Sequence, residues 1–234
     1  IQPGAPSTAI LNQLADAGIL PSVVAGRLYL EGPARGREMQ WGTYVIPASS
    51  RPVDVIEMVL QGRVKQFDLT VIEGMAADEI GEVLLAAEVA GTEAWPAVVG
   101  NSNLVADIAP EATSLEGFLF PDTYTFSTGV TAQTVARVMI DRFRGVWTEI
   151  LASEEPPSMS ALDLVTLASL VEAETSVPEE RRRVAGVFIN RLRRGMLLQC
   201  DPTVVFALKR QGTWTGRLLR VHWKTDDPYN TYRY

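Results

Sequence analysis

Four glutamates within nine residues, Glu172, Glu174, Glu179 and Glu180, form a compact group of side chains that could transfer protons. The first two end an apolar run, and the last two follow Pro178. Glycosidases commonly use two carboxyl groups that flank the bond to be cleaved. We therefore asked whether any two of these glutamates could face each other, and which one could serve as an acid.

The spacing of Glu172 and Glu174 separates them. On a helix predicted over residues 161–174, residues two apart point to nearly opposite sides. Burial against large apolar side chains raises the pKa of a carboxyl group, and a general acid near neutral pH needs that rise. The large apolar residues that share a helix face with Glu174 are Leu167, Leu170 and Val171. Glu174 is the better candidate acid, although the pattern also fits a solvated residue at a helix end, which is the commoner case.

Glu179 and Glu180 fit a different role. Ser176-Val-Pro-Glu179 reads as a capping box, with Pro178 in the first turn of a helix that continues to Arg194. Acidic side chains in the first turn stabilise the helix dipole. We expect these two glutamates to serve the start of that helix.

The other reactive side chains are few. A single cysteine, Cys200, excludes an intramolecular disulfide, and together with the single histidine, His222, it cannot build a usual structural zinc site. The lysines Lys65, Lys209 and Lys224 lie in no recognisable cofactor motif, which argues against a pyridoxal-phosphate lyase with its Schiff-base lysine. We expect no metal and no cofactor.

Composition narrows the class of protein. The 234 residues are 47% hydrophobic and 21% charged, which is typical of a globular chain with a sizeable core. The net charge is −7, and acidic residues predominate between residues 75 and 159. Nucleic-acid binding is therefore not expected, because it needs a continuous basic face. No window is long and apolar enough to span a bilayer.

The elements that must position these residues indicate an α+β fold. Residues 1–70 read as a small α/β unit with a helix capped by Ser7 or Thr8, a strand over 40–46 and a helix over 53–60. Residues 71–234 read as mainly helical. The expected elements beyond residue 66 are a strand over 67–72, an irregular strand or loop over 119–126, and helices over 76–90, 131–151, 161–174 and 178–194. The last helix is expected to bury Val184, Val187, Phe188 and Leu192.

Four long segments resemble the endolytic murein transglycosylase family, also called YceG-like, the membrane-anchored lytic transglycosylases. They are L-E-G-F-L-F-P-D-T-Y (115–124), L-A-S-L-V-E-A-E-T (167–175), V-A-G-V-F-I-N-R-L-R-R-G-M-L-L-Q-C-D-P-T-V (184–204) and P-Y-N-T-Y (228–232). Upstream segments such as W-G-T-Y (41–44) and T-V-I-E-G-M (70–75) follow the same pattern. The resemblance covers almost the whole chain, and the C-terminal segments make it specific.

The resemblance implies a fold and a site. It implies a LysM-like domain over 1–70 and a mixed, mainly helical, lysozyme-like catalytic domain over 71–234. The family's catalytic residue is the Glu directly before Thr, which is Glu174 here. The other motif positions, expected to bind substrate or support the cleft, are Glu116, Asp122, Tyr124, Asn190, Gln199, Asp201, Thr203, Tyr229, Asn230 and Tyr232.

The resemblance also implies an activity and its setting. The family cleaves peptidoglycan glycan strands internally between MurNAc and GlcNAc and leaves 1,6-anhydro-MurNAc ends, with one Glu as general acid and base. It implies cell-wall synthases (penicillin-binding proteins) as partners and a single-pass anchor in the bacterial cell membrane, with the catalytic part outside the cytoplasm. Two alternatives stay open: a lysozyme-like muramidase that uses water, and a non-catalytic glycan-binding module resting on residues 1–70.

The sequence departs from the family pattern in two respects. Cys200 stands where Ser or Thr is common, which puts a hydroxyl contact there in doubt. The family has an N-terminal transmembrane helix and further structure after the P-Y-N-T-Y segment. We therefore expect this sequence to be a C-terminally truncated piece of the longer protein.

Overall fold

The computed structural model describes residues 1–152 and 158–234, and the contacts within the chain divide it into two units. Unit 1 comprises Ile1–Thr70, Gly81–Trp95 and Asp122–Val135, and unit 2 comprises Val71–Ile80, Pro96–Pro121 and Ala136–Tyr234. Helices and one small sheet occur together, as the predicted α+β class requires.

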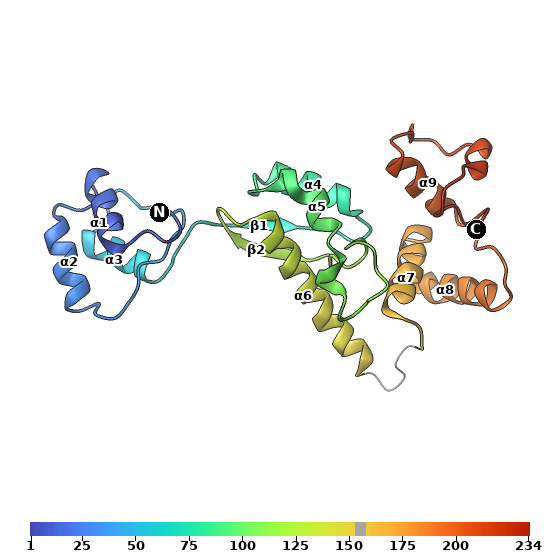
Figure 1. The fold of residues 1–234 in the computed structure, drawn as a ribbon, viewed down its shortest axis with the longest axis horizontal. Helices are drawn as coiled ribbons and strands as arrows, with labels where there is room; N and C mark the ends of the chain where they lie inside the picture. The colour runs from blue at the N-terminus through green and yellow to red at the C-terminus, as the bar shows by residue number, and fades with distance from the viewer. Residues whose placement is uncertain (153–157) are drawn as a thin grey trace. The chain divides into compact units, whose positions relative to one another are not determined.

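The N-terminal part of unit 1 is a group of three helices, α1 (Ser7–Asp16), α2 (Val23–Glu31) and α3 (Pro52–Leu60), drawn in blue to cyan in Figure 1. Ser22 begins α2 by accepting a hydrogen bond from the backbone N–H of Ala25 at 3.3 Å. The prediction that Ser7 or Thr8 caps α1 is wrong, because Pro6 is the N-cap and no side chain caps it. The core of this group is made by Ile10, Leu11, Leu14, Leu20, Ala34, Val55, Ile56, Val59 and Leu60.

Residues 40–46 do not form the predicted strand. Their backbone groups form hydrogen bonds with separate parts of the chain. The N–H of Gln40 donates to the carbonyl of Val59, and the N–H of Gly42 donates to the carbonyl of Ile1. A strand needs one neighbour over several residues, and Gly42 also interrupts the extended backbone with a φ of +137°.

The sheet of unit 1 consists of two antiparallel strands, β1 (Gln66–Thr70) and β2 (Thr123–Ser127). Leu69 pairs with Tyr124 and Phe67 with Phe126, so the apolar residues of both strands share one face. On the other face, the hydroxyl of Thr125 donates to Asp68 at 2.7 Å. The predicted strand over 67–72 is thus confirmed with shifted ends. The segment 119–126, predicted as an irregular strand or loop, is irregular up to residue 122 and continues as β2.

The middle of the chain forms α4 (Ala77–Ala86), α5 (Trp95–Val99) and α6 (Ala132–Leu151), with the short 3-10 turns η1 (Thr92–Ala94) and η2 (Ser102–Val105). The predicted helices over 76–90 and 131–151 are confirmed. In unit 2, Phe118 is fully buried and its ring meets the edge of Phe143 on α6, with 5.2 Å between ring centroids. This contact fixes the L-E-G-F-L-F segment against α6.

The C-terminal part of unit 2 consists of α7 (Ala161–Glu174), α8 (Pro178–Arg193), α9 (Asp201–Arg210) and the 3-10 turn η3 (Arg220–Lys224). Figure 1 shows α7 crossing α8, and both helices bury residues in one cluster. That cluster is Leu167, Leu170, Val171, Phe188 and Cys200. Of the residues that α8 was predicted to bury, Phe188 is buried, Val184 is half-buried, and Val187 and Leu192 are exposed.

The caps of α7 and α8 differ. Ser160 accepts a hydrogen bond from the N–H of Asp163 at 3.1 Å, as its position predicts. The predicted capping box at Ser176 is wrong, because Val177 is the N-cap of α8 and its side chain makes no capping bond. Thr175 takes over this role: its hydroxyl accepts from the N–H of Val177 and donates to Glu180, both at 3.1 Å.

Candidate active site

Glu174 is the last residue of α7, and Thr175 after it is extended. The apolar residues on its helix face are buried as predicted, with Leu167, Leu170 and Val171 each less than 10% exposed. Glu174 itself is exposed, so of the two readings of this pattern the structure shows the commoner one, a solvated residue at a helix end. The helix ends at this residue, so no following turn covers the carboxyl group.

Two of the neighbouring glutamates, Glu172 and Glu180, are engaged within the protein. Glu172 forms an ion pair with Arg181 at 3.2 Å, which joins the end of α7 to the start of α8. Glu180 accepts the hydroxyl of Thr175. Glu174 forms no ion pair with any residue in the described ranges, and it accepts a hydrogen bond from a thiol instead. Compared with Glu172 and Glu180, Glu174 has the carboxyl group that is more available to a ligand.

Cys200 is that thiol, with its Sγ 3.5 Å from the Oε2 of Glu174. The side chain is 2% exposed and packs in the α7–α8 cluster. Burial, and secondarily the negative charge of Glu174, raise the pKa of Cys200 to about 12. The thiol therefore stays protonated at neutral pH and acts as a hydrogen-bond donor to Glu174.

Two polar segments, residues 199–203 and 228–232, are bound together beside this pair. The N–H of Gln199 donates to the carbonyl of Thr231, and the N–H of Cys200 donates to the hydroxyl of Thr231, both at 2.9 Å. The hydroxyls of Thr203 and Thr231 lie 2.9 Å apart. Gln199 has a left-handed φ of +53°, a conformation that costs a non-glycine residue energy and needs such surrounding contacts.

Asn230 organises the second segment from the inside. It is 0% exposed, and its amide nitrogen donates to the carbonyls of Trp223 and Thr225 at 3.0 and 2.7 Å. Its amide oxygen accepts from the N–H of Tyr232 at 3.0 Å. A buried amide with these partners holds the loop in one conformation.

Asp201, the first residue of α9, receives two aromatic donors. Its Oδ1 accepts the hydroxyl of Tyr232 at 2.7 Å and the indole N–H of Trp223 at 3.0 Å. The two rings stack with centroids 5.1 Å apart and planes 12° apart. Burial and the hydrogen bond to Asp201 raise the pKa of Tyr232 to about 12, and the charge of Glu174 adds to the rise.

Tyr229 and Asn190 lie at the surface. Tyr229 meets the edge of Phe206 with centroids 5.0 Å apart, and the guanidinium of Arg210 lies 4.9 Å from its ring centroid. Asn190 lines an open depression of about 270 Å³ on α8 with Val187, Arg191, Arg194 and Met196. Arg191 also donates to the side chain of Gln199 at 3.3 Å.

Glu116 supports the start of α4. Its carboxylate accepts the N–H of Ala77 at 3.1 and 3.3 Å, and the neighbouring Glu79 accepts the N–H of Ala76 and pairs with Lys209 of α9. Burial raises the pKa of Glu116, and the bond from Ala77 partly opposes that rise. Gly117 after it has a φ of +83° and approaches Val165 too closely for a side chain.

Asp122 and Tyr124 belong to unit 1. Asp122 is exposed and accepts the N–H of Thr123 at 2.8 Å. Tyr124 is buried and stacks on Phe126 with centroids 6.0 Å apart. Unit 2 brings Gln199, Asp201, Thr203, Asn230 and Tyr232 together near Glu174. Tyr124 instead packs in the sheet of unit 1, and Asp122 directly precedes β2.

Sequence reasoning missed two residues of this arrangement. Thr231 lies inside the P-Y-N-T-Y motif, so its position between two predicted site residues was a usable signal. Trp223 lies in an irregular segment, and nothing in the sequence indicates that it stacks on Tyr232.

The structure offers neither a metal site nor a membrane span in the described ranges. No group of three or more His, Cys, Asp or Glu side chains there could hold a metal ion. The Nδ1 of His222 accepts the N–H of Leu219, which occupies that nitrogen. No helix in those ranges is both long and apolar enough to cross a bilayer.

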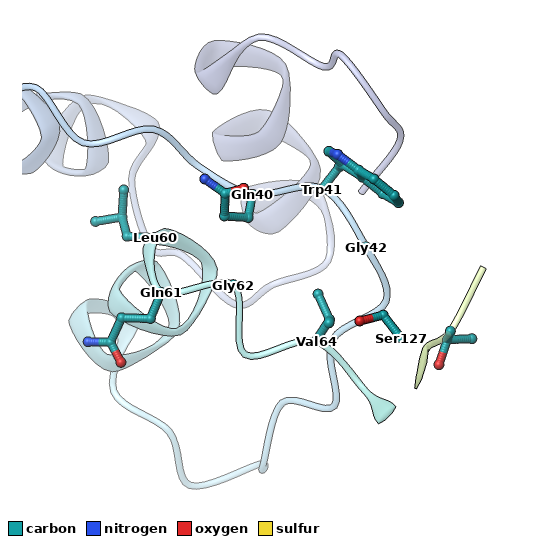
Figure 2. Close-up of a pocket in the computed structure, with 9 residues that line it drawn as sticks. Gln40, Trp41, Gly42, Leu60, Gln61, Gly62, Val64 and Ser127 are labelled. Carbon is teal, nitrogen blue, oxygen red and sulfur yellow. The ribbon is translucent and has the colours of Figure 1, made fainter. Parts of the chain in front are cut away.

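Unit 1 has a further open depression of about 390 Å³, shown in Figure 2. Trp41 lies at its rim and is 54% exposed, and no charged side chain lines it. The side chains of Gln40 and Gln61 point in different directions in Figure 2, so they do not converge on one ligand position. This depression therefore lacks the arrangement of a built site.

Comparisons with known proteins point to one family. A model of the YceG-like family matches residues 1–234. An endolytic murein transglycosylase of Bacillus subtilis is 37% identical over 120 residues, which is 51% of this chain and 32% of that protein. An endolytic murein transglycosylase of Streptococcus pneumoniae is 31% identical over 121 residues, 51% of this chain and 22% of that protein. The chain thus spans a third or less of the length of these relatives.

A solved structure shares the fold. The crystal structure of a yceG-like protein from Listeria monocytogenes matches with a TM-score of 0.59 and 24% sequence identity. The match covers 100% of this chain and 80% of that one. At this identity the likeness concerns the fold alone.

Proposed function

The chain belongs to the YceG-like family, and from this premise we propose that it is a lytic transglycosylase that cuts peptidoglycan glycan strands internally, with Glu174 as the single acid and base. The observation that carries the proposal is the setting of Glu174. It is an exposed carboxyl group at a helix end, beside a buried thiol and two polar segments that are bound to each other. Curated relatives named endolytic murein transglycosylases support the substrate class.

The proposed reaction needs one carboxyl group. Glu174 gives its proton to the oxygen that links MurNAc C1 to GlcNAc, and that C1–O bond breaks as an oxocarbenium-like centre develops. The carboxylate then takes the proton of the same sugar's 6-hydroxyl, whose oxygen bonds to C1. The product is a 1,6-anhydro-MurNAc end, and no water is consumed. An intramolecular nucleophile has a high effective molarity, so a second carboxylate is unnecessary.

The surroundings of Glu174 suit this cycle. The protonated thiol of Cys200 donates to one oxygen of the carboxylate and leaves the other oxygen available to the sugar. A bound glycan strand would cover the exposed group and exclude water from it. In this proposal Gln199, Asp201, Thr203, Asn230 and Tyr232 support the strand or the loops that hold it.

The larger organisation is part of the same proposal. Residues 1–70 would act as a LysM-like glycan-binding domain, and residues 71–234 as a lysozyme-like catalytic domain. The family places such proteins outside the cytoplasm on a single membrane helix, beside penicillin-binding proteins. Size-exclusion binding of fragment 1–70 to solubilised glycan strands would test the first assignment, and an unretarded strand peak would contradict it.

Product analysis tests the reaction. Incubation with purified peptidoglycan should release muropeptides that end in 1,6-anhydro-MurNAc, identified by mass spectrometry. Glu174→Gln should fold normally and release none. Unchanged release by a folded Glu174→Gln variant would overturn the assignment of Glu174.

One observation favours a second candidate, a muramidase. Glu174 is exposed, so water could reach C1 as the nucleophile. Its products would carry reducing ends, each one water heavier than the anhydro form. The same mass spectra therefore decide between the two reactions.

A further inference from the structure

We propose that Trp223 and Tyr232 together form a platform on which one sugar ring of the glycan strand stacks beside Glu174. This inference rests on the proposed function and assigns a substrate contact to Trp223. The ligand class is the N-acetylhexosamine ring, whose apolar C–H face suits an aromatic surface.

The geometry of the two rings makes a rigid surface. Their planes differ by 12°, and their centroids are 5.1 Å apart. The indole N–H of Trp223 and the hydroxyl of Tyr232 both donate to the Oδ1 of Asp201. Each ring is thereby fixed at its polar end, and little side-chain entropy remains to be lost when a ligand binds.

The base of the platform is also fixed. Asn230 is fully buried and bonds both to the carbonyl of Trp223 and to the N–H of Tyr232. The backbones that carry the two rings are thus joined through one side chain. Both rings remain half-buried, so part of the stacked pair faces solvent.

A chain of direct contacts places the platform next to Glu174. Glu174 touches Cys200, whose N–H donates to the hydroxyl of Thr231. Asp201 directly follows Cys200 and Tyr232 directly follows Thr231, and the hydroxyl of Tyr232 donates to Asp201. The electrostatic influence of Glu174 on Tyr232 agrees with this short path.

The chemistry of the surface selects a pyranose ring. The polar ends of both aromatic side chains are already satisfied by Asp201, so the rings offer mainly their apolar faces. Such a surface positions a sugar without taking part in proton transfer. Loss of the ring should therefore weaken substrate binding more than it slows the chemical step.

Kinetics with soluble, uncrosslinked glycan strands test the platform. Trp223→Ala should raise KM about tenfold and change kcat less than threefold, the scale of one aromatic contact. Trp223→Phe keeps a ring and should raise KM less than threefold. The matched control is Trp147→Ala, since Trp147 also stacks at 12° on a ring, that of Phe143 on α6. Circular dichroism confirms that each variant is folded.

A binding measurement avoids dependence on cleavage. Tryptophan fluorescence of the Glu174→Gln protein is titrated with a β-1,4-linked hexamer of N-acetylglucosamine. The change should shrink when Trp223→Phe is added and persist when Trp147→Ala is added.

The outcomes separate the two proposals. An unchanged KM and an unchanged fluorescence response in the Trp223 variants would overturn the platform. A fall in kcat alone, equal for Phe and Ala, would also overturn it, because Trp223 would then act only through Asp201. Full cleavage by Glu174→Gln would instead overturn the proposed function, whatever the Trp223 variants show.

Discussion

Two glutamates of unit 2, Glu116 and Glu174, lie in opposite environments. Glu116 is half-buried, its pKa is raised by burial, and both carboxylate oxygens face the N–H of Ala77. Glu174 is exposed, and a thiol is its hydrogen-bond partner.

The difference shows that burial alone does not identify a catalytic carboxyl group. Perturbed pKa values occur at functional sites, but structural groups show them too. Both carboxylate oxygens of Glu116 accept the backbone N–H of Ala77 at the start of α4, where this N–H group has no partner within the helix. Glu174 keeps an oxygen available and lies where separate polar segments meet. Glu174 is favoured because one of its carboxylate oxygens is available to a ligand and because the polar segments 199–203 and 228–232 meet beside it.

The largest expected effect is that of Glu174→Gln on cleavage. Removal of the proposed general acid and base should lower kcat roughly 10²- to 10⁴-fold. The free energy of unfolding in urea should stay within about 0.5 kcal/mol of the parental value, because the side chain is exposed. Release of soluble muropeptides measures the first effect.

Glu172→Gln is the matched control, since it lies two residues earlier on the same helix. It removes an exposed ion pair with Arg181, which contributes at most about 1 kcal/mol to stability. It should cleave at the parental rate. Equal losses of activity in the two variants would show that the end of α7, rather than one carboxyl group, is what matters.

The next effect is that of Asn230→Ala. The substitution leaves the carbonyls of Trp223 and Thr225 and the N–H of Tyr232 without their partner. Unpaired buried polar groups cost about 1–3 kcal/mol each before relaxation, so we expect about 2–4 kcal/mol lower stability in urea unfolding. Cleavage should also fall, because the second polar segment loosens. A parental unfolding midpoint would contradict the structural role of Asn230.

A smaller effect is expected from removal of the hydrogen-bond donor of Cys200, and it can be distinguished from the effect of changing the size of the side chain. Cys200→Ser keeps a donor to Glu174 and should stay within threefold of the parental kcat. Cys200→Ala removes the donor and should lower kcat about tenfold, the worth of one hydrogen bond to a charged group. Rates of muropeptide release compare the two. Equal activity of the serine and alanine proteins would show that the Cys200–Glu174 contact does not assist the reaction.

Much of the fold follows from sequence patterns. The helix over 131–151 carries a long periodic apolar face, the helix over 161–174 begins at the capping residue Ser160, and the strand at Phe67 and Leu69 alternates. The strand predicted over 40–46 failed because its hydrogen-bond partners come from distant segments, which periodicity does not reveal. Val187 and Leu192 lie on a helical face that no other described element covers enough to bury them.

The candidate site was predictable only in part. Helix geometry predicts that Glu174 and Glu172 point to different sides of the helix. In the structure Glu174 contacts Cys200, whereas Glu172 pairs with Arg181. Exposure of Glu174 was the commoner of the two readings of the pattern, but the pattern could not decide between them, because burial at a helix end depends on what lies beyond the end of α7. The contact with Cys200 and the stack of Trp223 on Tyr232 join residues that are 26 and 9 positions apart, and such contacts arise from packing alone.

The smallest effect concerns the pH dependence of stability at Glu116. Its pKa is raised in the folded chain above the ordinary value of 4.5, so the folded state holds this proton more tightly than the unfolded state. The stability that it contributes is complete below about pH 4.5 and is lost as pH rises through the folded pKa. The glutamine of Glu116→Gln does not titrate. As pH rises through the folded pKa of Glu116, the free energy of unfolding of the variant should therefore increase relative to that of the parent, as measured by urea unfolding.

Glu79→Gln gives the opposite sign and completes the comparison. The hydrogen bond from Lys209 lowers the pKa of Glu79, so its contribution is present above about pH 4.5 and disappears as pH falls through the folded pKa. The Glu79→Gln protein should therefore lose stability relative to the parent at neutral pH and recover it in acid. If both variants changed with pH in the same direction, burial would not be what distinguishes Glu116. The contrast between Glu116 as a desolvated structural carboxyl group and Glu174 as the available, proposed catalytic one would then lose its physical basis.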